Sequence, residues 1–154
     1  MSAYFRPRQG GKIRWALVSP SDETWDNGTP VMLTNVSGVA TWAKYDGTQN
    51  VLVGVATENV VESNALQTAH AVVQGKEASA IIDPTVVETS LIATGVTFLP
   101  GEGVYANSDA EYTNDAGSSD TAFLGYCLKG NAANADAKGA TTITFAYQPD
   151  DWRS

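Results

Sequence analysis

The side chains that could take part in catalysis are few, and they do not form a recognisable catalytic set. The chain of 154 residues has one histidine, His70, and one cysteine, Cys127. No serine or cysteine stands in a motif with a histidine and an acid, so acyl transfer by a triad is not indicated. We expect His70 to be an ordinary strand residue and Cys127, in the apolar run AFLGYCLKG, to be a small buried residue. The sequence predicts a protein that is not an enzyme and has no cofactor.

Metal binding is also not indicated. A run of loop carboxylates, Asp109, Glu111, Asp115 and Asp120, offers oxygen ligands of the kind that calcium prefers. Their spacing does not match a known calcium loop, so we expect a solvated acidic loop. A single cysteine excludes the usual zinc sites with several cysteines.

Composition and charge narrow the function classes further. The chain is 43% hydrophobic, enough for one core and one domain. It can form no internal disulfide and has no apolar stretch long enough for a membrane span, so we expect a non-secreted protein folded in a reducing compartment. The net charge of -8 would repel nucleic acid and anionic membranes. The expected partner is another protein.

The positive charge is concentrated at the start of the chain. Residues 1–14 contain four basic side chains and no acidic one, which leaves five basic against 17 acidic side chains in the rest. Pro7 and the Gly10–Gly11 pair disfavour a helix, so residues 1–14 are predicted to form an extended basic arm. Tyr4 and Phe5 are costly to leave in water and suggest that this arm docks on a partner.

Residues 15–154 are predicted to form a single, mainly β domain, a compact β-barrel or β-sandwich-like fold of short strands. Period-two alternation indicates strands at 12–18 and 141–147, and short apolar runs indicate a meander of three strands between residues 30 and 58. Residues 69–83 are predicted to form a hairpin that turns at Gly75. The similar rhythm of residues 28–60 and 101–130 suggests a duplicated strand-turn-strand unit, although chance similarity is the alternative.

One short α-helix is also expected. Asp83 suits the N-cap, Pro84 suits the first helical position and Gly95 suits the C-terminal stop. Val87 and Leu91 would give this helix one apolar face.

Four pieces of the sequence, in one order, resemble a known family. They are Thr29 to Leu33 (TPVML), Trp42 followed by Asp46-Gly47-Thr48, Val51 to Ala56 (VLVGVA) and the run AVVQGKEASAIIDP. This order is similar to that of the head decoration proteins of tailed bacteriophages, the lambda-type capsid-stabilising family and its cement-type relatives. The resemblance covers about a third to a half of the chain. The long segment after Pro84 and the basic arm depart from the lambda-type pattern.

The resemblance implies a homotrimer that binds the major capsid protein on the outer surface of an expanded phage head, after synthesis in the host cytoplasm. We expect the capsid contact to lie in and just after the arm, at Tyr4, Phe5, Arg6, Arg8, Lys12, Arg14 and Trp15. Trp25 and Trp152 are further candidates for trimer or shell contacts. A plain core position remains the competing interpretation for Trp15 and Trp42.

Two other functions stay open. A carbohydrate-binding or host-surface-binding β-module on a phage particle would expose aromatic side chains on one platform, for which Tyr105, Tyr112 and Tyr126 are candidates. An enzyme is the other, and the sequence assembles no site for it.

Overall fold

The computed structural model describes residues 5–7, 12–19, 23–62, 71–117, 120–132 and 141–148, the first of these ranges by its backbone alone. These ranges contain β-strands and no helix, which confirms the mainly β class. The strands are β1 (Phe5–Pro7), β2 (Ile13–Val18), β3 (Pro30–Val36), β4 (Val39–Lys44), β5 (Val53–Ala56), β6 (Asn59–Val61), β7 (Ala71–Val73), β8 (Glu77–Ile81), β9 (Thr85–Thr89), β10 (Gly103–Ala106), β11 (Tyr112–Thr113), β12 (Ala122–Lys129) and β13 (Ile143–Tyr147).

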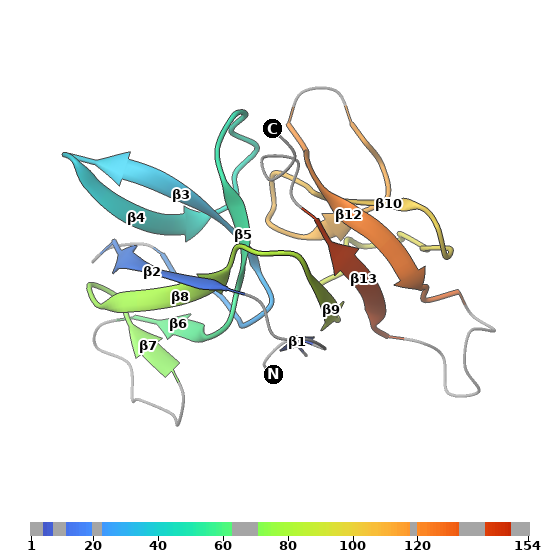
Figure 1. Ribbon diagram of the computed structural model, residues 1–154, viewed down its shortest axis with the longest axis horizontal. Coiled ribbons are helices and arrows are strands. Elements are labelled where there is room, and N and C mark those ends of the chain that lie inside the picture. The colour runs from blue at the N-terminus through green and yellow to red at the C-terminus, as the bar shows by residue number, and fades with distance from the viewer. Residues whose placement is uncertain are drawn as a thin grey trace.

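Five strands close a barrel in the order β2-β4-β3-β5-β8 (Figure 1). Its buried cluster includes the fully buried Trp42, packed among small residues that include Ala16, Ala56, Ala78 and Ala80. A narrow barrel has little interior space, so small residues opposite one indole are the packing that fits.

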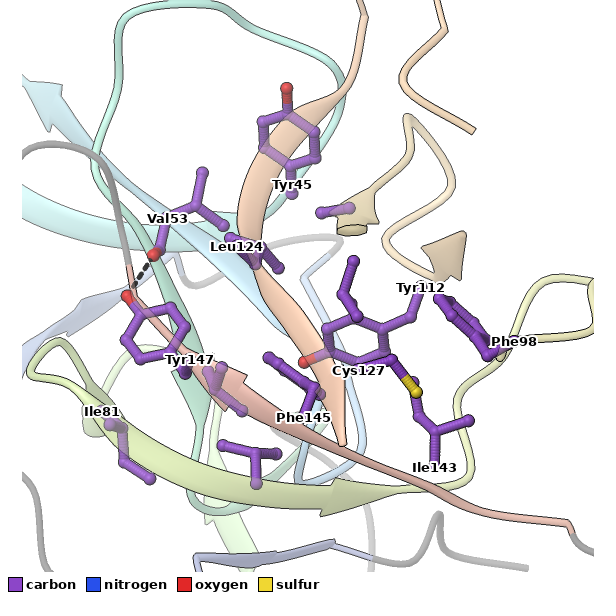
Figure 2. Packing of buried hydrophobic residues seen from close by; sticks show 14 of the residues in the cluster. Tyr45, Val53, Ile81, Phe98, Tyr112, Leu124, Cys127, Ile143, Phe145 and Tyr147 are labelled. Atoms are coloured by element: carbon purple, nitrogen blue, oxygen red, sulfur yellow. Dashed lines mark hydrogen bonds between the residues drawn. The ribbon is translucent and has the colours of Figure 1, made fainter. Parts of the chain in front are cut away.

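A six-stranded sheet, in the order β1-β9-β13-β12-β10-β11, lies beside the barrel (Figure 1). Its inner face contributes Phe145, Tyr147 and Leu124 to a cluster that also contains Val53 and Ile81 of the barrel strands (Figure 2). The alternation of β13, buried at residues 143, 145 and 147, matches the predicted period of two. The larger core of the molecule therefore lies between the barrel and the sheet.

Two tyrosine hydroxyls connect the sheet to the barrel within this core. The Tyr112 hydroxyl donates to the Gly28 carbonyl at 2.7 Å. The Tyr147 hydroxyl donates to the Val53 carbonyl at 2.5 Å, as Figure 2 shows. The pairing of β5 with β8 covers only residues 55 and 56, so the Val53 carbonyl lies outside that ladder. A buried carbonyl needs a hydrogen-bond donor, and the Tyr147 hydroxyl supplies the one that the β5–β8 ladder does not provide to Val53.

The predicted helix after Asp83 is wrong. Residues 85–89 instead form β9, which pairs with β13 on one side and with β1 on the other. The segment TVVET is rich in β-branched residues and alternates buried with partly buried positions. Tertiary pairing on both edges outweighs the local capping signals, which are worth only about 1 kcal/mol each.

The strands at residues 13–18, 30–36, 39–44 and 53–56 are where the sequence predicts them, whereas β6 at Asn59–Val61 was not predicted, and two connections differ. β3 pairs with both β4 and β5, so the three strands do not form a meander. The chain does turn at Gln74 and Gly75. However, the strands on either side of this turn do not pair with each other. β7 pairs in parallel with β6 and β8 pairs with β2 in the barrel, so the predicted hairpin is also wrong.

Candidate functional site

The barrel is closed only weakly between β2 and β4. The parallel ladder that joins these strands covers two residue pairs, Leu17 with Thr41 and Val18 with Trp42. We call the region before these pairs, residues 12–16 at the start of β2 and residues 39–40 of β4, the seam. It includes a groove of about 280 Å³ lined by Arg14, Trp15, Ala16, Leu17, Val39, Ala40 and Glu77.

The backbone of β2 directs polar groups into the seam. The Ile82 N–H donates to the Lys12 carbonyl at 3.0 Å, in register with the antiparallel ladder between β2 and β8. Because backbone groups alternate in direction along a strand, those of Ile13 and Trp15 point away from β8 and toward β4. They face the seam at a position that the β2–β4 ladder does not reach.

Hydrogen bonds from two side chains hold the first half of β2 and occupy one of its seam-facing backbone acceptors. The buried Trp42 indole donates to the Arg14 carbonyl at 3.1 Å and so fixes the first half of β2 to the barrel. The Arg14 guanidinium folds along the strand and donates to the Trp15 carbonyl at 2.9 Å. Arg14 therefore occupies an acceptor that a neighbouring strand would otherwise use.

Exposed apolar side chains gather around the seam. Ile13, Trp15, Val36 and Val39 have 46–56% of their surface exposed, and Val36 is the cross-strand neighbour of Val39. In the described residues these are four of the seven large hydrophobic side chains that are exposed. Single exposed apolar residues are common, but a group of them marks an interaction surface.

The strand predicted at residues 12–18 is present, and the face that it buries is the one with the smaller side chains. Ala16 and Val18 point into the barrel, and the larger apolar residues Ile13 and Trp15 lie on the outer face. The narrow interior accepts the small residues and excludes the large ones. The core interpretation is therefore wrong for Trp15 and confirmed for Trp42, which is fully buried.

The seam carries positive charge on an acidic protein. Lys12 and Arg14 are both exposed, and within the described ranges neither forms an ion pair. Glu77, also exposed, lies opposite Leu17 at the far end of the groove. Two exposed cations beside an apolar surface favour a partner with carboxylates.

The other predicted contact residues are distributed as follows. β1 places the backbone of Phe5, Arg6 and Pro7 on the edge of the six-stranded sheet, with Arg6 in register with Glu88. Tyr4, Arg8 and Trp152 lie outside the described residues. Trp25 is 6% exposed and forms an isolated bridge with Val60, so it belongs to the barrel cluster in this chain.

A second exposed surface lies on the six-stranded sheet. The rings of Tyr105, Phe123 and Tyr126 form two edge-to-face contacts, with centroids 5.4 and 5.2 Å apart. Tyr126 is 46% exposed and Leu128, further along β12, is 53% exposed. Tyr112 is fully buried and cannot belong to an aromatic platform at the surface.

The residues considered for catalysis and metal binding do not form a site in the described ranges. Those ranges contain no group of three or more histidine, cysteine or acidic side chains that could hold a metal, and His70 lies outside them. Cys127 is buried, and desolvation, with a smaller contribution from Glu102, raises its thiol pKa to about 11. Such a thiol is a poor nucleophile at neutral pH. Across the same ranges no helix is long and apolar enough to cross a membrane.

Comparison with protein-family models and with curated proteins gives no match for this sequence.

Proposed function

We propose that this chain is a non-enzymatic capsid decoration protein. It binds the major capsid protein on the outer surface of an expanded phage head, as a homotrimer, and stabilises the head against the pressure of packaged DNA. The observation that carries the proposal is the seam surface, where Lys12, Arg14 and Trp15 are exposed together next to Val39. These are three of the residues that the family resemblance suggests for the capsid contact.

The physical basis of such a function is simple. A protein that binds only the assembled lattice stabilises that lattice by mass action. Three binding surfaces in one trimer raise the effective concentration of each surface at its neighbouring site, so modest individual contacts suffice. An apolar anchor with flanking cations provides both contact area and complementarity to shell carboxylates.

The basic arm adds a second point of contact. Its residues 5–7 form β1, which among the described residues pairs with β9 alone and so lies at the edge of the six-stranded sheet. An edge strand presents backbone donors and acceptors that a strand of another protein can pair with. The arm and the seam are therefore both suited to main-chain recognition of the shell.

The proposal is tested with expanded heads that lack the protein. Deleting residues 1–14 is a poor probe, because Ile13 and Arg14 belong to β2 and the deletion would damage the barrel. The double charge reversal Lys12→Glu with Arg14→Glu keeps the strand and is expected to weaken co-sedimentation with heads at least tenfold. The control reverses two other exposed cations, Lys44→Glu with Lys129→Glu, and should stay within twofold of wild type. Wild-type protein that does not co-sediment at all would refute the decoration function.

Carbohydrate or host-surface binding is the second candidate. The aromatic group of Tyr105, Phe123 and Tyr126 favours it, because the exposed Tyr126 ring, supported by two partly buried rings, offers an apolar face to a sugar. The Tyr105 ring lies over Gly103, which has no side chain to displace it. A glycan array with wild type and Tyr126→Ala decides this: glycan binding that depends on Tyr126 would favour this function, and a blank array would remove it.

A further inference from the structure

We infer that the seam accepts an extended acidic segment of the partner, which adds as a strand along β2. This inference deepens the proposed function, on which it rests, by naming the chemistry of the segment that is recognised. It makes the barrel the acceptor of a strand in addition to any strand that the arm donates.

The backbone of β2 has the geometry that strand addition needs. Ile13 and Trp15 direct their N–H and carbonyl groups toward the seam, and the ladder to β4 begins only at Leu17. Main-chain hydrogen bonds to such an edge supply affinity, and the alternating side chains supply specificity. The groove beside these residues, about 280 Å³, lies between β2 and the start of β4.

In the free protein, the Arg14 side chain occupies a backbone acceptor that the added strand would use. Its guanidinium donates to the Trp15 carbonyl. An incoming backbone N–H would replace this bond and release the guanidinium. The released Arg14, with the exposed Lys12 next to it, would then pair with carboxylates of the incoming segment.

The same reasoning predicts the pattern of the segment. The outer face of β2 presents Ile13 and Trp15, so apolar side chains of an added strand would lie beside them. Acidic side chains of the added strand would form ion pairs with Lys12 and Arg14. We therefore expect an extended segment that combines alternating apolar residues with carboxylates, supplied by the capsid shell. A second copy of this acidic chain is the competing occupant.

The test measures backbone protection, which a contact through side chains alone would not produce. Amide hydrogen exchange is followed residue by residue for the full-length protein, free and bound to expanded heads. The Trp15 amide should exchange at least tenfold more slowly on heads. The Ala16 amide is the internal control, because it faces β8 in the existing ladder and should not change.

A pair of matched variants accompanies the exchange measurement. Val39→Asp places a carboxylate in the groove and should weaken head binding at least tenfold. Leu128→Asp makes the same kind of change at a side chain of similar exposure, 53% against 49%, on a strand of the other sheet, and should stay within twofold of wild type. Urea unfolding of both variants checks that each is folded.

The outcomes separate this inference from the function on which it rests. Slow Trp15 exchange on heads with loss of binding in Val39→Asp supports strand addition. Binding to heads without a change in Trp15 exchange, or with equal effects of the two variants, overturns strand addition and leaves the decoration function intact. Slow Trp15 exchange in concentrated protein without heads would make a second copy the occupant and overturn the inference. Failure of wild type to bind heads refutes both.

Discussion

The two tyrosine hydroxyls that cross the core should contribute measurably to the stability of the protein. Tyr112→Phe and Tyr147→Phe each remove one hydroxyl and leave one buried carbonyl, of Gly28 or Val53, without that donor. A buried polar group deprived of its partner costs about 1–3 kcal/mol. The two substitutions together should therefore lower the free energy of unfolding by about 2–6 kcal/mol, a large part of the typical 5–15 kcal/mol.

The assay is urea unfolding followed by tryptophan fluorescence. The double variant should shift the midpoint to lower urea while the slope of the transition stays the same, because the same surface is exposed on unfolding. Tyr126→Phe removes a hydroxyl from a half-exposed ring and should change stability by no more than about 0.5 kcal/mol. Equal midpoints for the double variant and Tyr126→Phe would refute the reasoning.

Three further predictions concern single residues. Burial raises the pKa of Tyr112 well above its usual 10.0. The stability that Tyr112 contributes is therefore present below pH 10 and is lost as pH rises toward the higher folded-state pKa. The free energy of unfolding should fall less steeply with alkaline pH in Tyr112→Phe than in the wild type. Gly125→Ala should destabilise the protein by more than about 3 kcal/mol, because a Cβ there would lie 1.8 Å from the Ala146 carbonyl oxygen. Gly38→Ala has open space around it and should cost only the roughly 1–2 kcal/mol of its positive φ. The urea midpoints of both variants check these values. The buried Cys127 thiol, with its pKa near 11, should resist iodoacetamide at pH 8 in the native protein and react within minutes in urea, as mass spectrometry would show.

Local patterning predicts most strands but not their partners. The alternation of residues 143–147 and the turn before Val39 are properties of a few neighbouring residues, and both are found as expected. The pairing of β3 with β5 joins residues across an intervening strand, and no short-range signal specifies it. The segment 85–89 also shows that local signals do not specify pairing. The capping residues around it favour a helix, but pairing with β1 and β13 makes it a strand.

The candidate site was predictable in residue type but not in form. Lys12, Arg14 and Trp15 are identifiable from charge and aromatic character alone. That Trp15 faces outward depends on the narrow barrel interior, which favours Ala16 on the inner side. Val39 could not be found, because its role follows from where the β2–β4 ladder begins. An exposed valine directly after a turn is the only local signal at that position.

The measurement that tests the central claim most directly is the binding of purified protein to expanded heads that lack it. Decoration predicts saturable binding at a fixed number of copies per head and a higher temperature of head rupture at saturation. Heads that bind no protein, or that bind it without any change in rupture temperature, would contradict the claim.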